Sequence, residues 1–151
     1  QSHLWLWALN QHLDWGYEVA RAWGFEPVQT ITWCKPGLGV GRFQCNSEQI
    51  IVARRGGRRG NPFGATGGTW FEWPRGRHSA KPAEFYALVE RVSPGPYLEM
   101  YARRHREGWE CVGDELVPAV YGACGVLDCR DCLPLHDADN NPIPADAEAT
   151  R

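Results

Sequence analysis

The chain opens on an almost wholly apolar segment, residues 3–9, that has no polar face. Such a run is typical of a central strand in a parallel sheet that is covered on both sides. Apolar or small residues then recur at helical spacing from Leu13 to Ala20, which predicts a helix. Asp14 is placed to cap this helix, and Gly24 is placed to end it.

The remaining pattern continues the alternation of strands and helices. β-branched and aromatic runs predict further strands, and an apolar stripe after Pro82 predicts a second helix that residues 93–96 end. The predicted strands span residues 28–33, 49–53, 69–73, 97–102 and 109–112. Residues 54–68 are rich in glycine and arginine and predict a loop. Strand, helix and strand in this order predict a doubly wound α/β sheet, in which ligands bind at the carboxyl ends of the strands.

Composition narrows the class of protein. With 43% hydrophobic and 23% charged residues, the chain has the balance of a soluble globular domain. It contains no long apolar run that would cross a membrane and no export signal, so we expect a cytoplasmic protein with reduced cysteines. The net charge is −2, with arginines clustered at 54–59 and 103–106 and acidic residues enriched from Asp128 to Glu148. This distribution predicts one positive face within a nearly neutral molecule.

Polar residues follow the predicted strands where a ligand would bind. Asn10 follows the first strand and Lys35-Pro36-Gly37 follows the second. Lys81 lies with His78 at the start of the second helix, which is an anion site that suits an amino-acid carboxylate. Glu99 lies near the end of a strand, where a carboxylate suits paired ribose hydroxyls. Together these residues predict a site for a nucleoside joined to an amino acid.

Six segments, in order and spacing, make the chain resemble a known family. They are residues 3–10 (HLWLWALN), 22–25 (AWGF), 32–36 (TWCKP), 76–86 (GRHSAKPAEFY), 90–103 (ERVSPGPYLEMYAR) and 108–115 (GWECVGDE). The chain resembles the family of the catalytic, seventy-kilodalton subunit of the mRNA N6-adenosine methyltransferase, and is most similar to its bacterial and phage DNA-adenine members. The resemblance covers roughly residues 3–116.

The resemblance implies a Rossmann-like fold that uses S-adenosylmethionine to methylate the N6 amine of adenine in DNA. The family's catalytic Asp-Pro-Pro-Trp motif precedes these segments, and this chain does not contain it. We therefore expect an N-terminally truncated portion with an incomplete sheet, inactive on its own. The alternative is a non-catalytic nucleic-acid-binding or partner subunit of a methyltransferase. Another nucleotide-binding α/β domain is disfavoured, because the glycine-rich residues 37–41 precede no clear helix.

The resemblance also assigns roles to individual residues. Lys81 would contact the cofactor's carboxylate, Glu99 and Arg103 its ribose, and His105 its amino-acid end. Asp114 and Glu115 occupy the place of an Asn-Gln pair that lies against the adenine ring. The substrate residues would be Asn10, Lys35, Pro36 and Asn46, with residues 39–49 forming a gate for the substrate adenine. Without the resemblance, a lysine such as Lys81 at the start of a helix is more often simply solvated, and Glu99 could be a structural partner of an arginine. The tryptophans at 5, 7, 23 and 33 are expected in the core rather than as platforms for base stacking.

The C-terminal part carries a separate signal. Three thiols and an imidazole follow one another closely at Cys124, Cys129, Cys132 and His136, a donor set that suits tetrahedral Zn²⁺. The alternative is a set of unpaired thiols. We therefore predict a methyltransferase portion over residues 1–116, a Cys/His knuckle over 117–137 and a disordered acidic tail over 138–151. The predicted partner is nucleic acid, DNA rather than RNA, with no membrane, and the protein is expected to form a homo- or heterodimer.

Overall fold

The computed structural model describes residues 1–39, 42–57, 67–76 and 80–116. They belong to two compact units, Gln1–Pro94 and the part that begins at Gly95. The first unit contains a four-stranded sheet in the order β1-β3-β2-β4. Its strands are β1 (Ser2–Ala8), β2 (Glu26–Cys34), β3 (Ser47–Arg55) and β4 (Trp70–Glu72).

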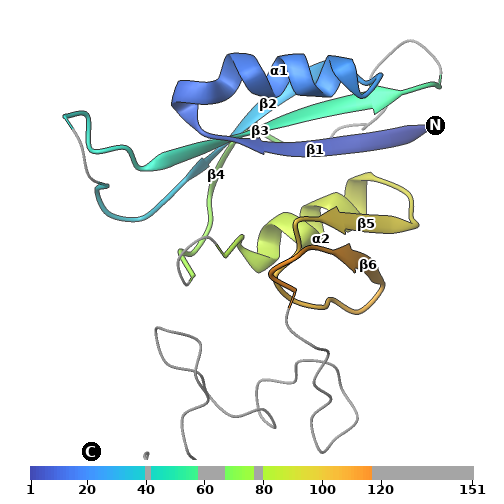
Figure 1. Cartoon of the computed structure of the whole chain (residues 1–151). Coiled ribbons are helices and arrows are strands. Elements are labelled where there is room, and N and C mark those ends of the chain that lie inside the picture. The colour runs from blue at the N-terminus through green and yellow to red at the C-terminus, as the bar shows by residue number, and fades with distance from the viewer. Residues whose placement is uncertain (40–41, 58–66, 77–79, 117–151) are drawn as a thin grey trace, which may run out of the picture. The chain divides into compact units, whose positions relative to one another are not determined.

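β3 is the core strand of this sheet. Its four consecutive apolar residues, Ile50 to Ala53, are all buried, with at most 4% exposure. A strand can bury residues of both parities only if both of its faces are covered. Helix α1 (Leu13–Ala22) lies over one face, and helix α2 (Ala83–Val92) lies on the other (Figure 1).

Each helix reaches the sheet through specific close contacts. A short 3-10 turn, η1 (Asn10–His12), leads into α1. Gly16 of α1 approaches so closely that an added Cβ would lie 2.8 Å from Ile51 Cδ1 and 3.2 Å from Ala8 Cβ. On the opposite face, Phe85 of α2 packs edge-to-face on Trp7, with ring centroids 4.8 Å apart. These contacts place even-numbered and odd-numbered residues of β3 under different helices.

The strand directions correct part of the predicted parallel sheet. β1 and β2 both pair antiparallel with β3, so they run in the same direction and form a β-α-β unit with β3 inserted between them. β2 and β4 pair in parallel. The prediction that β1 is a central strand of a parallel sheet is wrong for the described residues: β1 lies at the sheet edge, and all of its residues are half-buried. The apolar run could not reveal this, because helices cover both faces of an edge strand here.

Most predictions made from local sequence signals are confirmed, with three exceptions. Gly24 ends α1 in a left-handed conformation, with Phe25 N–H donating to Ala20 C=O and Gly24 N–H to Arg21 C=O, as in a Schellman motif. Asp14, however, lies in the first turn and is not the cap, since His12 occupies that position. Trp23, predicted to be in the core, is 39% exposed.

The third exception is the start of the arginine-rich loop. Arg54 and Arg55 belong to β3. Arg54 forms an ion pair with Glu26 (2.9 Å), and the Arg55 guanidinium lies 4.7 Å from the centre of the Phe25 ring. Arg58 and Arg59 lie outside the described residues.

The second unit contains a two-stranded parallel sheet formed by β5 (Tyr97–Met100) and β6 (Trp109–Val112). Tyr97 stacks on Trp109 across the pair, with ring centroids 4.9 Å apart. Among the described helices of both units, none has the length and apolar character needed to cross a membrane.

Candidate functional site

The register of β2 and β3 builds a charged cluster at one end of the sheet. Glu48 pairs with Trp33 across β2 and β3, and Trp7 pairs with Ile50 across β1 and β3. Because side chains alternate along a strand, Trp7, Trp33 and Glu48 all project toward α2. Lys35 follows β2 with the same parity as Trp33. This face therefore brings one carboxylate and one ammonium beside two indole rings.

Glu48 is held between two lysines. Its Oε1 pairs with Lys35 Nζ in a very short contact, and its Oε2 lies 2.6 Å from Lys81 Nζ. The side chains are only 14% exposed for Glu48, 19% for Lys35 and 25% for Lys81. Such pairs are weakly screened by solvent, so they should interact more strongly than pairs on an open surface.

The two tryptophans complete the surroundings of the lysines. Lys81 Nζ lies 4.2 Å from the centre of the Trp7 ring, and Lys35 Nζ lies 5.0 Å from that of Trp33. The two indoles meet edge-to-face at 5.7 Å, and Trp33 Nε1 donates to the Trp73 carbonyl. Both ammonium groups thus have an aromatic face on one side and a carboxylate oxygen on another.

The protonation state of Glu48 follows from these contacts. Partial burial by itself would raise the pKa of its carboxyl group. Hydrogen bonds from Lys35 and Lys81, together with their positive charges, outweigh burial, and the pKa of Glu48 lies below its ordinary value. Glu48 is therefore ionised at neutral pH and carries a negative charge between the two ammonium groups.

A second polar network lies on the α1 face of the same sheet end. Thr32 Oγ1 donates to Gln49 Oε1 (2.8 Å), and Gln49 Nε2 donates to Asn10 Oδ1 (2.9 Å). Asn10 Nδ2 in turn donates to Ser47 Oγ (3.1 Å) and Cys45 Sγ (3.3 Å). The side chain of Asn10 is thereby tied to the chain that leads into β3.

The structure divides the predicted substrate residues between the two faces. Lys35 joins Lys81 on the α2 face, whereas Asn10 bonds to residues of the α1 face. Pro36 is exposed just beyond Lys35, and Asn46 accepts a hydrogen bond at its carbonyl from Lys35 N–H (2.7 Å). Lys35 and Asn46 are therefore neighbours through the backbone, at the neck of the β2–β3 connection.

Five of the six predicted cofactor residues lie in the second unit. Arg103 and Glu115 form an ion pair at 2.8 Å, with a second bond of 3.2 Å, and their side chains are 51% and 63% exposed. Glu99 is half-buried in β5 on the same side as Tyr97, His105 is half-buried, and Asp114 is exposed after β6. An exposed pair such as Arg103–Glu115 stabilises a protein little, so a ligand can separate it at low cost.

No cluster of three or more potential metal ligands occurs within the described residues. The predicted Zn²⁺ ligands Cys124, Cys129, Cys132 and His136 lie outside them, as does His78.

Sequence reasoning missed the centre of the charged cluster. The third strand was predicted to begin at residue 49, which left Glu48 outside it, whereas β3 begins at Ser47. The available signal was the alternation of Glu48 with Ile50, but its partner Trp33 depends on strand register, which the sequence does not display.

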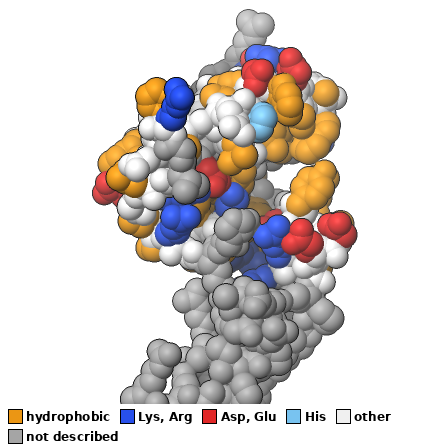
Figure 2. Space-filling view, turned by 60° about the vertical axis from the view of Figure 1, so that its left-hand side comes forward, with side chains coloured by type: hydrophobic (Ala, Val, Ile, Leu, Met, Phe, Trp, Pro, Cys, Tyr) orange, Lys and Arg blue, Asp and Glu red, His pale blue; other side chains and the backbone are white. Residues whose placement is uncertain are grey.

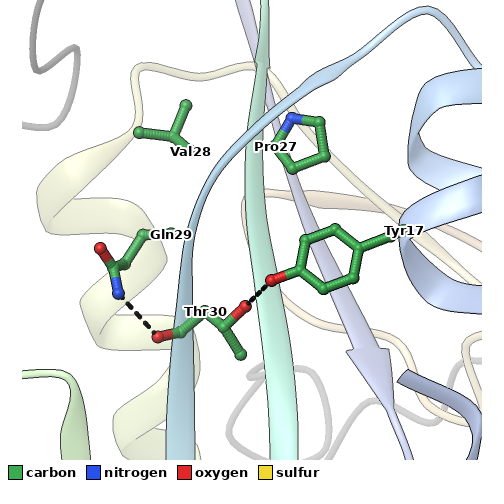
Figure 3. Close-up of a pocket in the computed structure, with 5 residues that line it drawn as sticks. All are labelled: Tyr17, Pro27, Val28, Gln29 and Thr30. Carbon is green, nitrogen blue, oxygen red and sulfur yellow. Dashed lines mark hydrogen bonds between the residues drawn. The ribbon is translucent and has the colours of Figure 1, made fainter. Parts of the chain in front are cut away.

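The surface hollows of the first unit are separate from these residues. One hollow is lined by Tyr17, Pro27, Val28, Gln29 and Thr30, and Figure 3 shows the Tyr17 hydroxyl bonded to Thr30 Oγ1 beside it. Another is lined by residues of β4 and α2 with Trp73. None of the predicted site residues lines either hollow.

The first unit is an α/β fold whose mixed sheet carries two lysines, a carboxylate and two indoles at one end. The sequence profile of the MT-A70 family matches residues 1–115. The chain belongs to the MT-A70 family.

Curated relatives agree with this assignment. The chain is 30% identical over 128 residues to the human N(6)-adenosine-methyltransferase catalytic subunit METTL3, a match that covers 75% of this chain and 21% of the human protein. It is 29% identical over 125 residues to an Arabidopsis thaliana N(6)-adenosine-methyltransferase MT-A70-like protein, covering 75% of this chain and 18% of that protein. A Drosophila melanogaster MT-A70-like protein is 27% identical over 128 residues, with 75% and 20% covered. The chain thus spans about a fifth of the length of these relatives.

Proposed function

We propose that the protein containing this chain transfers a methyl group from S-adenosylmethionine to the N6 amine of adenine in nucleic acid. The observation that carries the proposal is the cluster of Lys35, Glu48 and Lys81 between Trp7 and Trp33, in a member of the MT-A70 family. The β1–α1–β2 unit supports a Rossmann-like methyltransferase fold as part of the proposal.

The cluster offers suitable chemistry for both substrates. When bound, S-adenosylmethionine supplies an electrophilic methyl group on a sulfonium. The Lys81 ammonium has three donors, so it can bind the cofactor's carboxylate while it keeps its bond to Glu48. The Glu48 carboxylate has acceptor sites beyond the two used by the lysines, and these suit an amino group such as adenine N6.

The role of the cluster is therefore positional. The adenine amine is a weak nucleophile because its lone pair is delocalised into the ring, so its reaction depends on orientation and on acceptance of its hydrogens. Glu48 remains charged and orients hydrogen-bond donors. The lysines make Glu48 a weaker base than an ordinary carboxylate, so we assign it an orienting role rather than that of the general base.

The proposal also concerns which nucleic acid, DNA or RNA, carries the adenine. The resemblance to bacterial and phage members predicts DNA, whereas the curated relatives are named for adenosine, a ribonucleoside. Adenine in a duplex has its amine paired, so methylation of duplex DNA further requires base extrusion. DNA and RNA must therefore be compared directly.

The first test is binding of S-adenosylmethionine measured by calorimetry. The 151-residue chain is compared with its Glu99→Ala and Lys81→Met variants, with Glu18→Gln on the exposed face of α1 as the control. We expect binding to the chain and to the control, and a loss of at least tenfold in both site variants. Unchanged affinity in both site variants would overturn the assignment of these residues to the cofactor.

The second test is methyl transfer by protein from the complete reading frame that encodes this sequence. Tritiated cofactor is supplied with matched DNA and RNA oligonucleotides, single-stranded and duplex. Label in N6-methyladenine supports the enzyme. Nucleic-acid binding without transfer would instead support the second candidate, a non-catalytic or partner subunit.

A further inference from the structure

The connection between β2 and β3, which joins Lys35 to Glu48 along the chain, presents an aromatic side chain to solvent. Phe43 is 98% exposed, and Leu38 in the same connection is 70% exposed. Arg42, next to Phe43, is also exposed. Figure 1 shows this connection extending past the ends of the two strands. A phenylalanine so fully exposed adds little hydrophobic stabilisation to its own fold, and its ring is available to contact a ligand.

Backbone contacts hold the described residues of the β2–β3 connection, 35–39 and 42–46, in a defined conformation close to the two strands. This connection is called the arm, and Phe43 with Arg42 is called its tip. Lys35 N–H bonds to the Asn46 carbonyl at 2.7 Å, and Gly39 N–H bonds to the Gln44 carbonyl at 3.3 Å. An added Cβ on Gly39 would lie 1.9 Å from the Cys45 carbonyl oxygen, so the two backbones approach each other as only glycine permits. The hairpin pairing thus continues beyond the strands, up to the residue next to Phe43.

Asn10 fixes the same arm from the neighbouring strand. Its amide donates to Cys45 Sγ and to Ser47 Oγ at 3.3 and 3.1 Å. Asn10 follows β1, so these bonds tie the returning arm to the sheet. The predicted substrate residue Asn10 is thereby a positioning residue for the hairpin.

Phe43 lies within reach of the nucleotides that flank a bound adenine. It lies five positions before Glu48, so at full extension the two are no more than about 18 Å apart. Successive nucleotides of one strand rise by about 3.4 Å. A nucleic acid with its adenine at Glu48 would pass the tip within a few nucleotides.

The chemistry of the tip favours a nucleobase over a protein surface. Between Thr32 and Gln49 the charged residues are Lys35, Arg42 and Glu48, two cations and one anion. An exposed aromatic ring next to a guanidinium is the combination that single-strand binders use to stack bases and hold phosphates. Apolar side chains inserted at base steps also help to unstack DNA.

We propose that Phe43 stacks on a nucleobase within a few nucleotides of the adenine to be methylated, supported by the backbone contacts of Lys35 and Gly39 with the returning chain. The inference rests on the proposed function, because it requires a nucleic-acid substrate. It adds a contact that lies outside the pocket for the target base.

The test compares Phe43→Ala, Phe43→Leu and Phe43→Trp in protein from the complete reading frame. Affinity is measured by fluorescence anisotropy with adenine-containing single-stranded DNA and with matched RNA. Loss of one stacked base should weaken binding by about 5- to 150-fold in the Ala variant. The Leu variant should be similarly weak because it lacks a ring, and the Trp variant should stay within about twofold of the natural protein.

Three results would overturn the proposal. Unchanged affinity in Phe43→Ala would mean that Phe43 does not contact the nucleic acid. Unchanged affinity in Phe43→Leu would mean that an apolar side chain suffices and that no ring stacks on a base. A change of molecular mass by light scattering in Phe43→Ala would assign the tip to a protein partner. Cofactor affinity by calorimetry should not change in any variant. If the unsubstituted protein binds neither DNA nor RNA, the proposed function itself fails, which is a distinct outcome.

Discussion

Glu48 is the residue on which the charged cluster depends. It neutralises two ammonium groups that are each at least three-quarters buried, and removing its charge would leave both lysines facing each other without a counter-ion. Breaking a buried pair costs about 3–5 kcal/mol, and an exposed pair contributes about 1 kcal/mol or less. For this intermediate burial we expect Glu48→Gln to lower the free energy of unfolding by about 2 kcal/mol at pH 7. Urea denaturation measures the change, with Glu18→Gln as the control.

The same comparison has a defined pH dependence. The pKa of Glu48 is lower in the folded protein than its ordinary value of 4.5, so the folded state binds the proton less tightly than the unfolded chain. Its stabilising effect is therefore fully present above about pH 4.5 and is lost as the pH falls through the folded-state pKa. The gap in unfolding free energy between the natural protein and Glu48→Gln should close in that range. A gap that stays constant down to pH 3 would mean that the loss comes from packing rather than from charge.

At the scale of elements, the sequence predicts those features that depend on residues close together in the chain, such as the ends of helices. Gly24 marks the end of α1 because glycine readily adopts the left-handed conformation, and Pro82 marks the start of α2 because proline fixes φ. The direction of β3 and its register depend on contacts between distant residues, which a single sequence does not show. For that reason the predicted elements were largely correct, whereas the pairing of Glu48 with Trp33, and with it the cluster, was not predicted.

The packing of α1 on the sheet makes a prediction at this scale. An alanine at position 16 favours a helix by about 1 kcal/mol, but its Cβ would lie 2.8 Å from Cδ1 of Ile51, which is fully buried. Overpacking costs about 1–3 kcal/mol, so Gly16→Ala should destabilise the protein by about 1 kcal/mol in urea denaturation.

A double-mutant cycle tests that cause directly. Ile51→Val removes the methyl group that the new Cβ would meet. In that background Gly16→Ala should be neutral or should stabilise the protein by up to about 1 kcal/mol. An equal loss in both backgrounds would contradict the proposed contact between α1 and β3.

At the scale of the whole molecule, the predicted site residues are divided between the two compact units. Lys35, Glu48 and Lys81 come together in the first unit by strand register and by the start of α2. The remaining predicted cofactor residues belong to the second unit, where Arg103 and Glu115 already bond to each other. Chemistry at strand ends predicted Lys35, Lys81 and Glu99 as residues of interest. The detailed roles came from the family resemblance, and they stay predictions until cofactor binding is measured.

Charge balance over the whole chain makes the last prediction, which concerns salt. The chain has 16 basic and 18 acidic residues, and acidic and basic side chains are interspersed on the face shown in Figure 2. Several described cations already have acidic partners: Lys35, Arg54, Lys81 and Arg103. We therefore expect only about two or three phosphates to be neutralised. Affinity for single-stranded DNA should then fall only about 7- to 20-fold between 50 and 200 mM salt, measured by anisotropy.

The size of the salt effect distinguishes binding through base contacts from binding through phosphate contacts. A modest loss means that base contacts supply much of the binding, as stacking by Phe43 requires. A loss of about 10³-fold or more would require about seven phosphate contacts and would contradict the charge argument. In that case Arg58→Glu with Arg59→Glu is the next variant, because these arginines belong to the basic cluster predicted from the sequence, and a reduced slope would assign the contacts to them.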